Sequence, residues 1–196
     1  MEPLPIVQTG AAVLRARAAE LSPAQLATPQ AQALIATMID VMRAAPGVGL
    51  AAPQIGIPLR VIVLEDTDDT MANSDALEVR EKERVAFATR TIVNPVLAMI
   101  GDATATFFEG CLSVDGFAAL VERHREVEVT GLDEHGAPIR WRVAGWPARI
   151  LQHEVDHLDG TLYIDRMLTR TFAAVAHVRH RFAGRGIAEI RAELGV

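Results

Sequence analysis

The segment from Pro147 to Leu158 constrains the fold of this chain more than any other part of it. Proline stands in its first turn and Gly160 follows its end, which is the usual punctuation of a helix. Apolar side chains recur along the segment at helical spacing, at Ile150, Leu151, Val155 and Leu158. Because such a face must be covered, the sequence predicts a helix that is packed into a core.

The same helix carries His153, Glu154 and His157 in the order His-Glu-x-x-His. Two histidines four residues apart project from one helix face about one turn from each other, near enough to hold one metal ion. Glu154 lies beside them, where a carboxylate can act as a general base toward water. The pattern predicts a metal site, against the alternative of a polar helix face that happens to carry two histidines.

A zinc-type site needs a third protein ligand, whose identity the spacing leaves open. One metalloprotease pattern would place a histidine at position 163, which is Tyr163; another needs a distant glutamate, for which Glu189 and Glu193 are available downstream. Cys111 is the remaining candidate. A lone cysteine is often a small buried hydrophobe, but a charged residue and a glycine precede it, at Glu109 and Gly110, which is unlike a core strand and favours the ligand role.

A third feature is the glycine-rich run from Gly47 to Gln54, which reads GVGLAAPQ. It lacks the third glycine of a dinucleotide-binding fingerprint and the Gly-Lys-Ser/Thr of a phosphate-binding loop. Glycines at 47 and 49 let the backbone approach a ligand closely, and Gln54 offers an amide donor. A tight turn without function is the alternative.

Periodicity predicts an α+β fold with an antiparallel or mixed sheet, in a single domain over 1–196 with a C-terminal helical extension over 166–196. Helices are expected over 11–20, 30–44 (ended by Pro46 and Gly47), 171–181 and 187–194, in addition to the helix described above. Strands are expected over Leu59–Leu64, Thr91–Val93, Val127–Thr130 and Ile139–Val143, with a turn over Gly131–Pro138. The charged stretch Glu65–Arg84 is expected to be a surface excursion between strands.

Composition narrows the class of protein. The 196 residues include 19 Lys and Arg against 25 Asp and Glu, a net charge of −6, which argues against a DNA-binding or other nucleic-acid-binding protein. A single cysteine excludes an internal disulfide and favours the cytoplasm, and the first ten residues lack the pattern of a signal peptide. The two long uncharged runs, 21–39 and 44–59, contain prolines that exclude a membrane-spanning helix.

Together, the three segments GVGLAAPQ, EGCLS and QHEVDH resemble the signature motifs of the peptide deformylase family, in the same order and at similar separations. The resemblance extends from Ile6 to about Phe172, and the sequence around the site is most similar to the branch of the family that includes organellar deformylases. It implies a compact α+β domain with the His-Glu-x-x-His helix at its centre. It also implies hydrolysis of the N-formyl group from the terminal methionine of newly synthesised polypeptides, with release of formate.

Carried over by position, the resemblance makes Cys111, His153 and His157 the metal ligands and Glu154 the acid/base. Gln54 and the Leu112 backbone N–H become the oxyanion donors. Ferrous iron is the expected metal, with zinc, nickel or cobalt as substitutes. The residues expected to contact substrate are Gly47, Val48, Gly49, Gly110, Trp146 and Ile150.

The chain departs from many bacterial members at Asp115, Ala118 and Glu122, which affects the substrate subsites. From Arg166 onward it carries six arginines against two glutamates. This positive segment is either a solvated helix face or a surface that contacts the RNA of the ribosome. A homodimer is expected by analogy. Three other functions compete with deformylation: a peptidase for internal bonds, an enzyme with Cys111 as nucleophile, and a metal-binding scaffold without activity.

Overall fold

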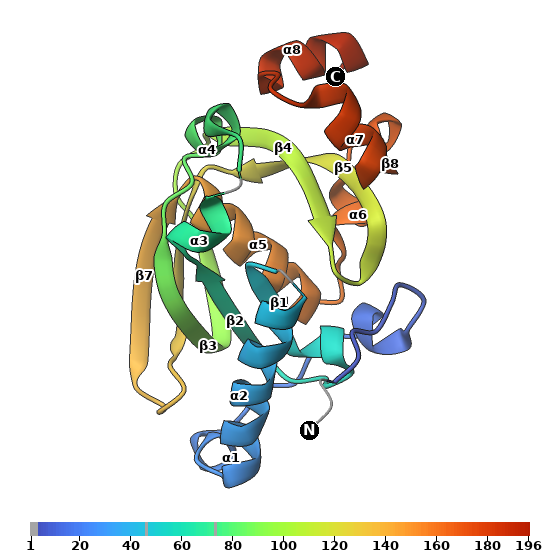
Figure 1. The fold of residues 1–196 in the computed structure, drawn as a ribbon. Coiled ribbons are helices and arrows are strands. Elements are labelled where there is room, and N and C mark those ends of the chain that lie inside the picture. Colours follow the sequence, from blue (N-terminus) through green and yellow to red (C-terminus); the bar gives the residue numbers. More distant parts are fainter. Residues whose placement is uncertain (1–3, 46, 73) are drawn as a thin grey trace.

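The computed structural model describes residues 4–45, 47–72 and 74–196, and the predicted helix stop at Pro46 lies outside them. Two antiparallel sheets flank a central helix, α5 (Trp146–Leu158) (Figure 1). The first sheet has the order β1-β2-β3-β6-β7, and its strands are β1 (Gly49–Ala51), β2 (Val61–Asp66), β3 (Phe87–Met99), β6 (Glu126–Leu132) and β7 (Pro138–Ala144). The second has the order β4-β5-β8, and its strands are β4 (Thr104–Cys111), β5 (Val114–His124) and β8 (Ala173–Ala174). The α+β prediction is confirmed.

Strand β2 shows how the core is divided. Its side chains alternate between two faces, and both faces are buried. Val61 and Val63 pack with the long helix α2 (Pro29–Ala44), whereas Ile62 and Leu64 pack with α5. Burial on both faces explains why this strand reads as a continuous apolar run.

The remaining helices are short and lie around this frame. They are α1 (Pro23–Leu26), α3 (Asp68–Met71), α4 (Ala76–Glu81), α6 (Tyr163–Arg166), α7 (Val175–Phe182) and α8 (Ile187–Leu194), with 3₁₀ turns η1 (Ala12–Arg15), η2 (Ala52–Ile55) and η3 (Thr169–Thr171). Helices α7 and α8 form the end of the chain and lie away from α5 (Figure 1). No helix in the described part of the chain is both long and apolar enough to cross a bilayer.

Most predicted elements are present, with shifted ends. The helices over 30–44 and 187–194, the helix 147–158, the four strands and the turn between β6 and β7 are confirmed, and β3 is much longer than expected. The helix predicted over 171–181 is α7, which begins at Val175 and not at Thr171, because η3 and β8 precede it. The charged excursion holds α3 and α4, and it is closed at its base by two hydrogen bonds of 2.7 and 2.8 Å from Arg84 to the buried Asp66.

The predicted helix over 11–20 is wrong. Only the turn η1 forms, and the chain then runs extended, with Ala18 N–H donating to Leu158 O and Ala19 N–H to Pro58 O, both at 2.8 Å. These partners from distant segments replace the intrahelical bonds that an alanine-rich segment would otherwise make.

Candidate active site

Helix α5 places the two histidines and Glu154. Its apolar side packs Leu151 and Leu158 against the first sheet, so another side of the helix is free to face the second sheet. The rings of His153 and His157 lie there, with centroids 5.0 Å apart at an interplanar angle of 75°. The two rings are therefore held one helical turn apart, as the spacing predicts.

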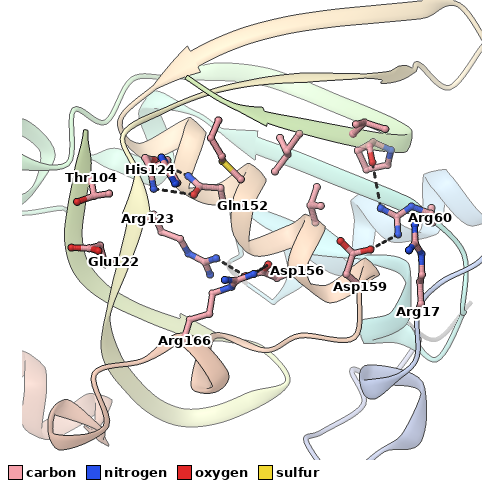
Figure 2. Close-up of a pocket in the computed structure, with 15 residues that line it drawn as sticks. Arg17, Arg60, Thr104, Glu122, Arg123, His124, Gln152, Asp156, Asp159 and Arg166 are labelled. Carbon is pink, nitrogen blue, oxygen red and sulfur yellow. Dashed lines mark hydrogen bonds and ion pairs between the residues drawn. The ribbon is translucent and has the colours of Figure 1, made fainter. Parts of the chain in front are cut away.

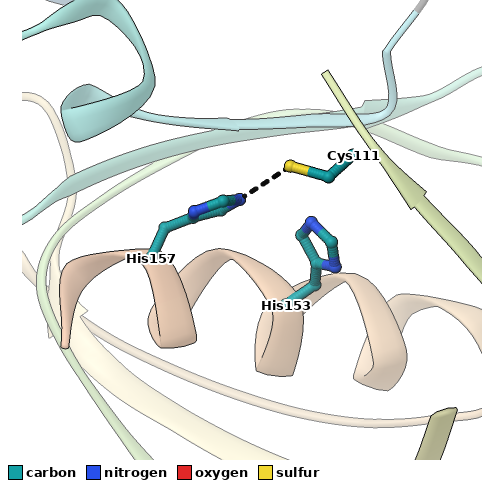
Figure 3. Close-up of side chains that lie close together, drawn as sticks. All are labelled: Cys111, His153 and His157. Carbon is teal, nitrogen blue, oxygen red and sulfur yellow. Dashed lines mark hydrogen bonds between the residues drawn. The ribbon is translucent and has the colours of Figure 1, made fainter. Parts of the chain in front are cut away.

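Cys111 joins them from the end of β4 (Figure 3). Its Sγ lies 3.2 Å from His157 Nε2, and one ligand atom from each of Cys111, His153 and His157 lies within 4.8 Å of the others. A soft thiolate and two imidazoles within this distance are a donor set that fits one transition-metal ion. The structure thus brings together the third candidate that the sequence left open.

The other candidates for a third ligand do not reach this group. Glu189 and Glu193 lie on α8, where they pair with Arg185 at 2.7 and 2.6 Å. The hydroxyl of Tyr163 donates to Phe117 O at 3.1 Å, although its ring stacks near His153 with centroids 6.3 Å apart. Tyr163 is consequently a neighbour of the site that the sequence gave no reason to include.

Gln54 is fixed next to the thiol. The side chain is 2 % exposed, and its Oε1 accepts the Ala51 N–H at 2.9 Å. The amide nitrogen therefore faces the other way, 3.5 Å from both Cys111 Sγ and Ser113 Oγ. This geometry presents a preorganised N–H donor to the space beside the Cys/His/His group.

Glu154 is buried beside the histidines under strand β1. It is 4 % exposed, its Oε2 has no hydrogen-bond partner among the described residues, and burial raises its pKa to about 7. A Cβ at Gly49 would lie 2.8 Å from Glu154 Cδ, and one at Gly47 would lie 3.1 Å from Leu112 Cδ1. The two glycines therefore make room for protein side chains, and at Gly49 the side chain is the predicted acid/base.

A layer of buried charges supports His153. Its Nδ1 lies 3.0 Å from Glu109 Oε2, and since a carboxylate only accepts, the ring donates. Glu109 also accepts two bonds from Arg123, at 3.0 and 2.9 Å, and one from Arg149 at 2.6 Å. Burial alone would raise the pKa of Glu109, but the bonds from His153 and Arg123 hold it well below its usual range.

Sequence reasoning missed this layer. The prediction of Cys111 as a ligand rested in part on the view that a charged residue such as Glu109 does not belong in a core strand. That view is wrong here, because Glu109 lies in strand β4 and is only 5 % exposed. Arg149, one turn before His153 in a helix that is packed into the core, was the signal that a buried anion lies nearby.

The predicted substrate contacts are divided between two places. Gly110 lies in β4 opposite Ala118, and Leu112 follows Cys111 directly in the turn to β5. Ile150 is 4 % exposed within the α5 core, against which Val48 and Trp146 pack. These roles, including that of the Leu112 N–H, remain predictions.

A cavity of about 650 Å³ is lined by residues of α5, β3 and β5 (Figure 2). Gln152, Asp156 and Asp159 line it from the helix end. Asp156 accepts two bonds from Arg166, at 2.7 and 2.8 Å, and also pairs with Arg123. The charge network therefore extends from the Cys/His/His group to the edge of this cavity.

A partly buried thiol and two histidines, with a glutamate and an amide donor beside them, form the kind of site that metal-dependent hydrolases use. The polypeptide deformylase family profile matches residues 3–172, and the chain belongs to this family. The expected resemblance is confirmed.

Three relatives define the similarity. The chain is 53 % identical over 173 residues to "Peptide deformylase 1A, chloroplastic" of Solanum lycopersicum, covering 88 % of this chain and 62 % of that protein. It is 54 % identical over 170 residues to "Peptide deformylase 1A, chloroplastic/mitochondrial" of Arabidopsis thaliana, covering 87 % and 63 %. It thus spans less than two thirds of the length of these two relatives. A crystal structure of a class I type b peptide deformylase from Acinetobacter baumannii, bound to Met-Ala-Ser, matches with a TM-score of 0.74 and 33 % identity, over 84 % of this chain and 98 % of that one.

Proposed function

We propose that this protein is a peptide deformylase, which hydrolyses the N-formyl group from the terminal methionine of newly synthesised polypeptides and releases formate. The observation that carries the proposal is the pair of buried groups around the Cys/His/His cluster, Glu154 and Gln54, neither of which is a candidate metal ligand. A protein that only stored or displayed a metal would have no use for either group. Membership of the deformylase family supports the same activity.

In this proposal Cys111, His153 and His157 hold a divalent metal ion, which when bound supplies a Lewis acid for the formyl oxygen and for water. The donor set, in which His157 is buried and the other two residues are partly buried, fits such an ion, and His157 Nδ1 also lacks a protein partner among the described residues. Glu154 takes the proton from the attacking water and passes it to the departing amine of methionine.

The developing oxyanion is stabilised by two donors from this chain, the Gln54 amide and the Leu112 backbone N–H. Because Gln54 is anchored through its carbonyl oxygen to Ala51, the donor needs no reorganisation as charge appears. Gly47, Val48, Gly49 and Gly110 supply backbone along which an extended peptide binds, and Trp146 and Ile150 contribute to the apolar wall for the methionine side chain.

Formate release from formyl-Met-Ala-Ser tests the activity. We expect formate from the native protein, loss of activity with a chelator and recovery on adding back a divalent metal. Glu154→Gln is the matched control. Cleavage of an internal bond in an acetylated peptide would indicate a peptidase instead, and activity that survives chelation but not thiol alkylation would indicate Cys111 as a nucleophile.

We propose ferrous iron as the native metal, with zinc, nickel or cobalt as substitutes, because a thiolate and two imidazoles suit ferrous iron. Air should then inactivate protein purified without oxygen over minutes to hours, and nickel-loaded protein should keep its activity in air. Metal analysis of the anaerobic protein identifies the ion directly.

The setting of the reaction is also a proposal. The chain is assigned to the cytoplasm, as a single catalytic domain over 1–196 whose final segment, 166–196, carries the arginines toward the ribosome. Several of these arginines are already paired, as in the contacts of Arg181 and Arg185 with Glu193, which lowers the charge available to RNA. Sedimentation with ribosomes tests the contact, and light scattering tests the proposed homodimer.

A further inference from the structure

Arg149 is a buried arginine of α5 that takes no part in the proposed reaction. It is 4 % exposed and lies one helical turn before His153. Its Nη1 donates to Glu109 Oε1 at 2.6 Å and to Val121 O at 3.0 Å, while Nη2 donates to Ala105 O at 2.6 Å. A single side chain of the helix therefore bonds to both β4 and β5.

Charge balance alone does not require Arg149. Glu109 already has a two-bond partner in Arg123, and Asp156, which Arg123 also contacts, has its own two-bond partner in Arg166. A buried guanidinium loses its hydration, and burial lowers the pKa of Arg149, so its three hydrogen bonds must offset a desolvation cost. The arginine must then contribute something that Arg123, which lies on β5, cannot.

That contribution is geometric. The two oxygens of the Glu109 carboxylate bond to positions 149 and 153 of the same helix, with Oε1 on Arg149 and Oε2 on His153. Residues four apart share a helix face, so the carboxylate is clamped along α5 at two points. Glu109 also stands two residues before Cys111 on β4, and the clamp therefore sets the separation between the strand and the helix that carry the three ligands.

We propose that Arg149 is a positioning residue of the metal centre. It fixes the Glu109 carboxylate against α5, and Glu109 in turn fixes the ring of His153 and the place of Cys111. The inference rests on the metal site of the proposed function, and it does not depend on the reaction that the site catalyses.

Cobalt binding provides the test, because a thiolate ligand to Co²⁺ gives a charge-transfer absorption that reports both affinity and geometry. Metal-free protein is titrated with Co²⁺ without oxygen, and Arg149→Met is compared with Arg149→Lys. We expect Arg149→Met to bind Co²⁺ about 10- to 100-fold more weakly, with a shifted absorption band. The affinity of Arg149→Lys for Co²⁺ should lie between that of Arg149→Met and that of the native protein. The lysine keeps the positive charge but lacks the planar guanidinium that reaches all three acceptors.

Arg142→Met is the matched control, because Arg142 is an exposed arginine of β7 whose partner, Glu126 at 2.6 Å, has no contact with the site. It should bind Co²⁺ like the native protein. A double-mutant cycle then tests whether Arg149 acts through Glu109. Glu109→Gln should weaken Co²⁺ binding, and adding Arg149→Met to that variant should change the affinity by less than about threefold further.

Four results would overturn the inference. If folded Arg149→Met bound Co²⁺ with native affinity and an unshifted charge-transfer band, the arginine would only stabilise the fold, and its loss would change the melting temperature alone. Additive losses in the cycle would show that Arg149 does not act through Glu109. Should Arg149→Met fail to fold, native affinity in Arg149→Lys would have the same meaning. Failure of the native protein itself to bind Co²⁺ through Cys111 would refute the proposed metal site, and the inference with it.

Discussion

Replacing Gly49 by alanine tests whether strand β1 holds the acid/base in place. The added Cβ would lie 2.8 Å from Glu154 Cδ and 2.9 Å from Cγ, and it would approach Oε1 more closely still. Nonbonded carbon atoms prefer separations of about 3.5–4.0 Å, so the carboxylate must move by about 0.7–1 Å. Because Glu154 is 4 % exposed, it has little free space to move into.

A displacement of about 1 Å at a catalytic group can lower the rate by about 100-fold. Overpacking of a core costs about 1–3 kcal/mol, which in a chain of this size lowers the melting temperature by roughly 2–4 °C per kcal/mol. We therefore expect Gly49→Ala to retain its metal, to lose a few degrees of melting temperature and to lose about two orders of magnitude in kcat/KM. The assay is formate release from formyl-Met-Ala-Ser, with metal content and melting temperature measured on the same samples.

Gly131→Ala is the matched control. Its Cβ would meet Val93 O at 2.8 Å, a similar overlap on strand β6 away from the Cys/His/His group. It should lower the melting temperature at least as much and leave kcat/KM unchanged. If Gly49→Ala instead behaved like Gly131→Ala, with full activity and reduced stability only, the contact with Glu154 would not control the position of the carboxylate.

Four further changes probe the site and the fold. Glu154→Gln should keep the metal while turnover collapses, because a carboxamide cannot accept a proton; loss of metal together with activity would assign Glu154 a ligand role. Gln54→Leu should cost about 3 kcal/mol of transition-state stabilisation, or roughly 100-fold in kcat, with little change in KM; a large change in KM alone would restrict Gln54 to substrate binding. Cys111→Ser should lose most of its bound metal, since a neutral hydroxyl is a poor ligand, and an unchanged metal content measured by mass spectrometry would refute the Cys/His/His site. Glu65→Gln should lower the melting temperature at pH 7: hydrogen bonds, first from Arg43, lower the pKa of Glu65 to about 2, so its stabilisation is full above the unfolded value near 4.3 and fades as the pH falls toward 2. An equal loss at pH 7 and pH 3 would contradict that assignment.

The parts of the fold that the sequence predicts are those whose pattern is local. The thirteen residues of helix α5 include a proline in the first turn and apolar side chains at helical spacing. Strand β2 is recognisable from its run of aliphatic side chains. Strands β4 and β5 were missed, although they form the wall that carries Cys111. Their buried positions include Glu109 and Arg123, and charged residues at such positions hide the alternation that identifies a strand.

The same division explains which site residues the sequence reveals. His153, Glu154 and His157 are recognisable because one helix turn brings them together. Cys111 lies more than 40 positions earlier, and its place beside His157 depends on the β4–β5 hairpin, so residue spacing alone left the third ligand open. The family resemblance turned it from one candidate into the expected ligand, and the structure adds the geometry.

The supporting charges require the tertiary structure, because each partner looks unfavourable alone. Arg149 and Glu109 are both buried, and a buried charge is unfavourable without a partner; their contact at 2.6 Å supplies one. Positions 149, 153 and 156 of α5 form one polar stripe toward the second sheet, with Glu109 on the first two and Arg123 on the third. Asp156 also lines the cavity, so a change of charge there should reach His153 through Arg123 and Glu109. The strands β4 and β5 that carry these two residues therefore connect the cavity to the helix that carries His153.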